Sequence, residues 1–403
     1  MDTDLAIPFR ERKMRTKSAI TLIAILAWAL LPQSPRAQQK GGEDETGPYD
    51  VVPGFPQPLG PKGYIWGSQG GVFAETPDRI WIANRGELLI PQYLPKNYNG
   101  FYGSIDVSQT MNGASRRATP PDLMRNCIVI LDGNGKLIES WTQWDHLFEG
   151  GGTAEIGRGP HAIKISPYDP ERRVWVVDDI REAIFVFSHD GKKLLMTLGE
   201  PGVPGTDEKH FGDPTDIAFL PDGSFVVSDG YVNTRVMKFD KNGKFLMTWG
   251  KPDADKKHPQ PGELSTPHGI ATSKDGRVFV VDRGNQRIQV FDQNGEFLDQ
   301  WPGLRSPYAA YMSDDQHLWV ADGDNDKILE YDLNGKLLYA WGVHGTAPGQ
   351  MWGPHGLSVD SDGNLYVAET YGGRTQKFHP KPGADAWKVA GKPQPLMPLK
   401  AGD

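Results

Sequence analysis

The stretch Pro267-His-Gly-Ile-Ala-Thr-Ser-Lys-Asp-Gly-Arg-Val-Phe-Val-Val-Asp282 decides the fold of this 403-residue chain. It holds two short apolar runs rich in β-branched residues, with an Asp-Gly turn between them at 275–276. Such a turn between two β-type runs is typical of a hairpin. Two further runs follow, Arg287–Phe291 and Phe297–Trp301, around an Asn-Gly turn at 294–295. The segment therefore predicts four short antiparallel strands in succession.

The same pattern recurs along the chain, so the fold is built from repeats. Four other copies begin at Pro160, Pro214, Pro307 and Pro354, and a degenerate copy begins at Gln69. In four copies an acidic residue stands fifteen positions after the first proline: Asp229, Asp282, Asp322 and Glu369. Six copies of four antiparallel strands predict an all-β fold, a six-bladed β-propeller with four strands per blade. A linear solenoid is the alternative, but its terminal repeats would expose apolar faces.

Several segments depart from this repeat. Residues 38–58 form a polar, proline-rich lead-in, and the propeller is expected over residues 59–403. Residues 86–124 are a long insertion between the second and third strands of blade one. A Pro- and Lys-rich tail begins at about residue 381, and its run Trp387-Lys-Val-Ala is the candidate for the last strand.

The first 37 residues combine a basic stretch with an apolar run, which is typical of a secretory signal peptide. An uncleaved membrane anchor is the alternative, although the apolar run from Ala19 to Leu31 is short for a membrane span. We therefore expect a secreted or periplasmic protein without stable membrane association once residues 1–37 are removed. The formal charge of −8 disfavours nucleic acid as a partner. The only cysteine, Cys127, lies in an apolar run and is expected to be buried.

Three histidines occupy the same place in every second copy, namely His161, His268 and His355. The copies between them carry Gly70, Thr215 and Tyr308 at this position. The innermost strand of each blade lines the channel of a propeller, so the three imidazoles are expected to converge with threefold symmetry. Three neutral imidazoles with an open fourth position are a typical catalytic zinc site. A polar channel lining without a metal is the alternative.

Strand direction places further side chains on the same rim. The first strand of a blade starts, and the second ends, on one face of the disc, because adjacent strands are antiparallel. The residues just after second strands include Arg85, Arg283 and Tyr231. Two guanidinium groups beside a metal suggest a small-molecule or peptide substrate with a carboxylate. A salt bridge between blades is the alternative for each arginine, and packing is the alternative for the tyrosine.

Longer phrases go beyond the generic repeat. Arg287-Ile-Gln-Val-Phe-Asp292 is typical of NHL repeats. His210-Phe-Gly-Asp-Pro-Thr-Asp-Ile-Ala218, Val227-Ser-Asp-Gly-Tyr-Val-Asn-Thr-Arg235 and Val281-Asp-Arg-Gly-Asn-Gln-Arg-Ile-Gln289 are more specific. Over roughly residues 60–380, the chain resembles peptidyl-α-hydroxyglycine α-amidating lyase, also called peptidylamidoglycolate lyase.

This resemblance implies cleavage of the N–C bond of a C-terminal α-hydroxyglycine, which yields an amide and glyoxylate. It implies zinc on His161, His268 and His355, proton transfer by Tyr231, and carboxylate binding by Arg85 and Arg283. It also implies a structural calcium ion, held by backbone carbonyls near Val72 and Ile163. However, Gly356 stands where the family has an aspartate, and the family's disulfides have no counterparts.

Two other classes of function stay open. A different hydrolase or lyase on the same fold, such as a lactonase, would use a metal site of carboxylates and asparagine. A non-catalytic NHL propeller would serve as a binding module, with no stoichiometric metal and with basic or aromatic patches on a face of the disc.

Overall fold

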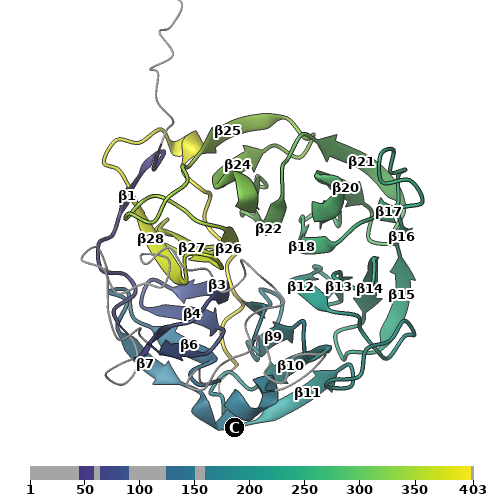
Figure 1. Cartoon of the computed structure of the whole chain (residues 1–403), viewed down its shortest axis with the longest axis horizontal. Helices are drawn as coiled ribbons and strands as arrows, with labels where there is room; N and C mark the ends of the chain where they lie inside the picture. Colours follow the sequence, from purple (N-terminus) through teal and green to yellow (C-terminus); the bar gives the residue numbers. More distant parts are fainter. Residues whose placement is uncertain (1–44, 59–63, 90–123, 150–158, 401–403) are drawn as a thin grey trace, which may run out of the picture. The chain divides into compact units, whose positions relative to one another are not determined.

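The computed structural model describes residues 45–58, 64–89, 124–149 and 159–400 of the chain. These residues form six four-stranded antiparallel sheets that surround a central axis as blades (Figure 1). The predicted six-bladed β-propeller is thereby confirmed. The predicted signal peptide and most of the predicted insertion lie outside the described residues. Within the described part of the chain, we find no helix whose length and apolar character would let it cross a membrane.

The strands follow the repeats in order. Blade one contains β3 (Gln69–Thr76), β4 (Arg79–Asn84), β6 (Ile128–Leu131) and β7 (Leu137–Ser140). Blade two contains β8 (Ala162–Ile165), β9 (Val174–Asp178), β10 (Ala183–Phe187) and β11 (Leu194–Leu198). Blade three contains β12 (Pro214–Phe219), β13 (Phe225–Asp229), β14 (Arg235–Phe239) and β15 (Phe245–Trp249). Blade four contains β18 (Pro267–Thr272), β19 (Val278–Asp282), β20 (Arg287–Phe291) and β21 (Phe297–Pro302). Blade five contains β22 (Pro307–Met312), β23 (Leu318–Asp322), β24 (Lys327–Tyr331) and β25 (Leu337–Trp341). Blade six contains β26 (Pro354–Val359), β27 (Leu365–Glu369), β28 (Arg374–Pro380) and β1 (Tyr49–Val51).

Short elements decorate the rims of this ring. Two small ladders pair β2 (Tyr64–Trp66) with β5 (Glu87–Leu89) and β16 (Lys251–Pro252) with β17 (Glu263–Leu264). The short 3-10 helices are η2 (Thr142–Phe148), η3 (Arg283–Asn285), η4 (Gly323–Asn325) and η5 (Ala386–Lys388).

The acidic residue fifteen positions after each proline holds the blade together. In blade four, Pro267 and Asp282 are directly opposite each other in the β18–β19 ladder. The buried carboxylate of Asp282 accepts hydrogen bonds from the backbone N–H of Ser265 at 2.7 Å and from Nε of Arg287 at 2.8 Å. It therefore ties the incoming loop, the second strand and the third strand together. Asp229, Asp322 and Glu369 likewise accept hydrogen bonds from backbone N–H groups of the incoming loop, so these residues have a structural role.

The outer strand of blade six comes from the other end of the chain. β1 pairs with β28, so residues from the predicted lead-in close the ring. The prediction that 387–390 form the last strand is wrong, since 386–388 form η5. Tyr49 packs against Trp341 of blade five, with ring centroids 5.6 Å apart, and against Phe378 of β28. A pair of large buried rings, rather than a local strand signal, thus fixes this seam.

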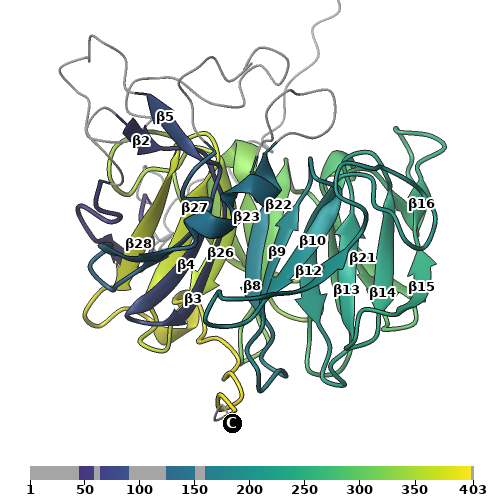
Figure 2. The same ribbon diagram turned by 90° about the horizontal axis from the view of Figure 1, so that it is seen from below.

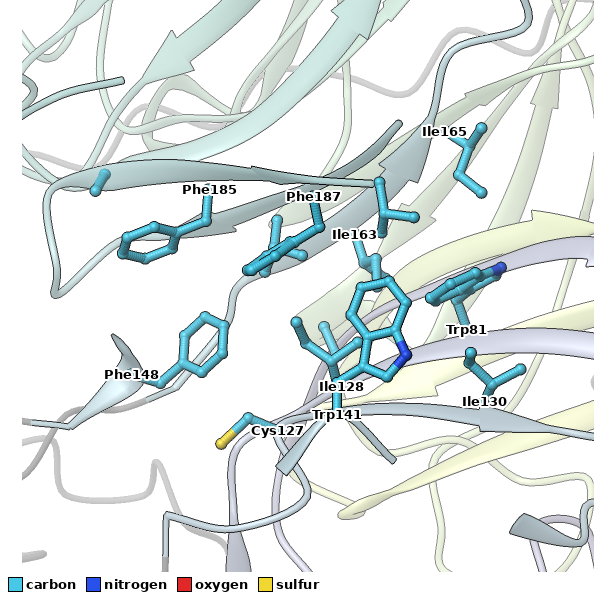
Figure 3. Close-up of a cluster of buried hydrophobic side chains, with 14 residues drawn as sticks. Trp81, Cys127, Ile128, Ile130, Trp141, Phe148, Ile163, Ile165, Phe185 and Phe187 are labelled. Carbon is cyan, nitrogen blue, oxygen red and sulfur yellow. The ribbon is translucent and has the colours of Figure 1, made fainter. Parts of the chain in front are cut away.

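Hydrophobic clusters fill the spaces between and within blades. The cluster in Figure 3 joins blades one and two, where Trp81, Trp141 and Phe187 meet in edge-to-face contacts. Cys127 lies in the same cluster without solvent exposure, and burial raises the pKa of its thiol. The prediction that Cys127 is buried is confirmed.

A buried polar network reinforces the junction between blades one and two. The carboxylate of Glu75, near the end of β3, accepts hydrogen bonds from Nε2 of His189 at 2.9 Å, Nη1 of Arg172 at 2.9 Å and Nε1 of Trp81 at 3.0 Å. Burial alone would raise the pKa of Glu75. These partners, His189 first, outweigh burial and lower the pKa to about 2.

The C-terminal tail crosses the face of the disc on which the first and second strands of each blade are joined. The backbone carbonyl of Gly391 accepts a hydrogen bond from Tyr311 of blade five. Further along, Met397 and Lys400 donate backbone hydrogen bonds to Pro167 and Pro170 of blade two. Blades two and five are opposite each other in a six-membered ring, so the tail spans the disc. Figure 2 shows the tail leaving this face, with β2 and β5 at the other face.

Candidate metal centre

An irregularity at the start of the innermost strands aims one residue of each blade toward the axis. In β18 the pairing register shifts between Pro267 and Gly269, so His268 has no cross-strand partner in the ladder. The same shift occurs in blades one, three, five and six, at Gly70, Thr215, Tyr308 and His355. Such a bulge lets a strand redirect a single side chain. In blade two, His161 lies just before β8.

The three predicted histidines meet at the centre of the ring. Nitrogen atoms of His161, His268 and His355 all lie within 4.8 Å of one another. The ring centroids are 4.6 to 4.8 Å apart, and none of the three residues is more than 6% exposed. The predicted convergence of side chains from blades two, four and six is therefore present in the structure.

The blades between them fix the orientation of the imidazoles. Nδ1 of His161 donates to the backbone carbonyl of Thr215, Nδ1 of His268 to that of Tyr308, and Nδ1 of His355 to that of Gly70, each at 2.7 Å. A carbonyl only accepts hydrogen bonds, so each Nδ1 carries a proton, and Nε2 is the nitrogen that a neutral ring can offer to a metal. This second contact is the usual way in which proteins orient a metal-binding histidine.

The charge state of the histidines also suits a metal. The pKa of His268 lies well below its usual value, first because the ring is buried and then because His355, Arg283 and Arg85 disfavour a positive charge there. The imidazole is thus neutral at ordinary pH, as a metal ligand has to be. Three buried imidazoles whose nitrogen atoms lie within 4.8 Å of one another can bind a metal, and three protein nitrogens leave a coordination position for a substrate.

Tyr231 reaches the same point from the loop after β13. Its hydroxyl lies 2.8 Å from Nε2 of His268 and 3.2 Å from Nε2 of His161. Gly230 before it lies directly against the backbone carbonyl of Pro267, and a Cβ at this position would overlap that oxygen. The small residue lets the loop approach blade four closely enough for the hydroxyl to reach the histidines.

Both predicted arginines lie near this cluster. Arg85 is buried after β4 of blade one, and Arg283 is the first residue of η3 in blade four. Each is close enough to lower the pKa of His268. The guanidinium carbon of Arg283 lies 4.3 Å from the ring centroid of Tyr308 and 5.8 Å from that of Tyr231. The sequence-predicted residues of blades one to four and six are thus gathered on one rim.

Three residues to which the sequence pattern assigns no role adjoin this rim, namely Tyr308, Asp324 and Tyr371. The hydroxyl of Tyr308 donates to Oδ1 of Asp324 at 2.9 Å and shares a hydrogen bond of 2.9 Å with the hydroxyl of Tyr371. Tyr308 was visible in the sequence as the counterpart of the histidines in blade five. No spacing signal pointed to its partners, because they come from other loops.

A small cavity lies at the channel centre, where the innermost strands meet, and it includes Val72, Ile163 and Gly356. Lys164 and Asp216 also line it, and their side chains form an ion pair of 2.7 Å. A Cβ at Gly356 would lie 3.1 to 3.3 Å from blades one and six, so a larger side chain has little room. An ammonium group inside the cavity and a glycine in place of a carboxylate do not suit the calcium ion that the resemblance implied.

Comparison with known protein families supports the repeat architecture of the propeller. The NHL repeat family matches residues 264–291 and 351–378. The chain is therefore a six-bladed β-propeller with NHL repeats and a buried cluster of three histidines on its axis.

Two relatives of this chain are named as peptide-amidating enzymes. The chain is 40% identical, over 144 residues, to peptidyl-glycine α-amidating monooxygenase B of Xenopus laevis. It is 36% identical, over 142 residues, to a probable peptidyl-α-hydroxyglycine α-amidating lyase of Caenorhabditis elegans. The matches cover 35% and 34% of this chain, but 16% and 39% of those proteins, so the chain spans well under two thirds of either relative. The second of these relatives carries the name of the lyase family that the sequence motifs resemble.

A solved structure of virginiamycin B lyase from Staphylococcus aureus has a similar arrangement of strands. It is 13% identical, covers 82% of this chain and 99% of its own chain, and has a TM-score of 0.46. A similarity this distant does not inform function.

Proposed function

We propose that this chain is a zinc-dependent lyase that cleaves the N–C bond of a C-terminal α-hydroxyglycine or a closely related carbinolamide, giving an amide and glyoxylate. One observation carries the proposal. Nitrogen atoms of three buried histidines lie within 4.8 Å of one another, and a tyrosine hydroxyl lies 2.8 Å from Nε2 of one of them. Homologues named as lyases of this type support the same reaction.

Zinc is the metal that the donor set favours. Three histidine nitrogens without a carboxylate are typical of catalytic zinc, whereas calcium prefers oxygen ligands. When bound, zinc would act as a Lewis acid that lowers the pKa of the substrate hydroxyl. The chain's own residues supply the remaining chemistry.

Tyr231 is the proposed acid-base residue. It accepts the proton of the substrate hydroxyl as the C–O bond becomes a carbonyl and the C–N bond breaks. The electron pair of that bond goes to the amide nitrogen, which takes up the proton that Tyr231 has accepted, so the products are a neutral amide and an aldehyde and Tyr231 returns to its starting state. Arg283 near its ring favours the phenolate form, because a positive charge stabilises a developing negative one.

Arg85 and Arg283 are the proposed binding groups for the substrate carboxylate. Guanidinium groups hold carboxylates through paired hydrogen bonds, and a site of low solvent access strengthens such contacts. Anchoring the carboxylate fixes the substrate so that its hydroxyl faces the histidines. We also propose export to the periplasm or the extracellular space, on the strength of the leader-like residues 1–37, with a carboxylate-bearing peptide or small molecule as substrate.

The direct test is a glyoxylate assay with an N-acyl-α-hydroxyglycine and the zinc-loaded protein. We expect turnover that disappears on chelation and returns with zinc. Tyr231→Phe should lower kcat by about 10²- to 10⁴-fold while zinc stays bound. The control is Tyr168→Phe, which removes a hydroxyl bonded to Gln394 on the opposite face and should leave turnover unchanged. Zinc-loaded protein with no turnover above background would exclude this reaction.

Metal analysis tests the site itself. His268→Ala should lose stoichiometric metal, whereas His258→Ala, which changes an imidazole that is 77% exposed, should retain it. Metal retained by His268→Ala would favour another metal site, as in a lactonase. A protein that binds no metal in stoichiometric amount would favour a binding module.

A further inference from the structure

We propose that Tyr308 is a positioning residue that holds Arg283 in place through its aromatic face, and so sets the preference of the site for substrates with a carboxylate. The inference rests on the proposed function for the identity of that substrate. It concerns a residue to which the reaction gives no chemical role.

Tyr308 stands among the histidines by position. It occupies the bulge of β22 in blade five, between His268 of blade four and His355 of blade six. Its ring centroid lies 5.1 Å from that of His268 and 5.4 Å from that of His355. Its backbone carbonyl also accepts the Nδ1–H of His268. One residue therefore contacts both the proposed metal ligands and the proposed anion-binding arginine.

The aromatic face of Tyr308 carries the guanidinium group of Arg283. The distance of 4.3 Å from the guanidinium carbon to the ring centroid is short for a cation–π contact. Arg283 itself is only half-buried and sits on a single-turn helix, where a long side chain has several rotamers available. A fixed aromatic surface favours the rotamer that lies over the histidine cluster.

The aromatic ring of Tyr308 is itself fixed by contacts at its edge and at its hydroxyl. Gly323 packs against it so closely that a Cβ there would overlap the ring. The hydroxyl is engaged by Asp324 and Tyr371. The side chain of Tyr308 is thus held as a fixed surface.

Tyr231 and Tyr308 have different proposed roles, because their hydroxyl groups have different partners. The hydroxyl of Tyr231 points to Nε2 of two histidines, where a reacting hydroxyl would lie. The hydroxyl of Tyr308 is bonded to groups outside the cluster and cannot take a proton from a substrate there. Tyr308 consequently affects binding of the anion, and Tyr231 affects the chemical step.

The experiment uses two independent readouts on zinc-loaded protein. The first is steady-state turnover of an N-acyl-α-hydroxyglycine. The second is calorimetric binding of an N-acylglycine and of the corresponding uncharged N-acylglycinamide, neither of which can react. Tyr308→Leu should raise KM and weaken binding of the acid by about tenfold, which corresponds to ~1.4 kcal/mol, with a much smaller change in kcat and in binding of the amide. Tyr308→Phe, which keeps the aromatic face, should recover most of the affinity.

Controls separate this role from a structural one. In an Arg283→Gln background, Tyr308→Leu should cause no further loss, because the two residues act through one contact. Tyr311→Phe on the same strand, whose hydroxyl bonds Gly391 on the opposite face, should leave all parameters unchanged. Equal losses for acid and amide, additive effects with Arg283→Gln, or loss of zinc from Tyr308→Leu would overturn the inference.

The two proposals can fail separately. If the wild-type protein binds the N-acylglycine in a Tyr308-dependent way but releases no glyoxylate, the lyase reaction is excluded and the positioning role stands. If turnover occurs but Tyr308→Leu leaves KM and acid binding intact, the positioning role is excluded and the reaction stands. A wild-type protein that neither turns over nor binds the acid would overturn both.

Discussion

Gly323→Ala is the substitution that most directly tests how the rim of the candidate site is held. A Cβ at this position would lie 2.9 Å from Cγ of Tyr308 and closer still to Cδ2 and Cε2. Ordinary carbon contacts are about 3.5 to 4.0 Å, so the ring edge would have to move by about 1.5 Å. A shift of this size disturbs the 2.9 Å hydrogen bonds to Asp324 and Tyr371 and the contact of the ring with Arg283.

Two effects of measurable size should follow. Overpacking of this kind costs about 1 to 3 kcal/mol of unfolding free energy. The lost support for Arg283 should weaken binding of an N-acylglycine by about tenfold. Zinc content should stay at the wild-type level, because the histidines are oriented by backbone carbonyls and not by the Tyr308 ring. Urea unfolding measures the first effect, and calorimetry with metal analysis measures the second.

A double-mutant cycle shows whether the clash with Tyr308 is the cause. In a Tyr308→Ala background the space for a Cβ is open, so Gly323→Ala should then cost little stability. The reasoning is refuted if Gly323→Ala destabilises both backgrounds equally, or if it leaves stability and acid binding of the wild-type protein unchanged.

Two further predictions concern the junctions between blades of the propeller. Because the pKa of Glu75 is lowered to about 2 in the folded state, its carboxylate stabilises the fold above its usual pKa, and this stabilisation is lost as the pH falls toward 2. Between pH 6 and pH 3 the free energy of unfolding of the wild-type protein should fall by about 2 kcal/mol through this group, or about 3 °C in Tm, and Glu75→Gln should not show this fall. An equal fall in both proteins, measured by calorimetry, would contradict the lowered pKa of Glu75. Trp341→Ala should leave a cavity beside Tyr49 and lower the free energy of unfolding by about 3 to 5 kcal/mol in a denaturant titration. Trp387→Ala, which changes a half-exposed side chain, should lower it by under about 1 kcal/mol.

The ring and the histidine cluster could be predicted from sequence because both depend on spacing. Pro267 and Asp282 lie fifteen residues apart since they are cross-strand partners, and the repeat of that interval defines the blade. The alternation of His161, His268 and His355 places them on one axis once the number of blades is known. These features follow from position alone, without any side-chain contact.

Features that depend on contacts between distant segments could not be read in this way. β1 has three residues and no strong strand pattern, yet Tyr49 contacts Trp341, which lies far away in the sequence. The run at Trp387 has a strand-like pattern, but the outer edge of β28 is already occupied by β1. Likewise, nothing in the sequence shows that the backbone carbonyl of Tyr308 faces His268.

The hydrogen bonds from the histidines to neighbouring carbonyls make the functional unit of this ring two blades long. One blade of each pair contributes an imidazole, and the next contributes the backbone oxygen that orients it. Loss or gain of a single blade would leave an odd number and break the alternation, whereas a pair can be exchanged as a module. Attempts to recombine this scaffold should therefore cut it into three double blades rather than six single ones.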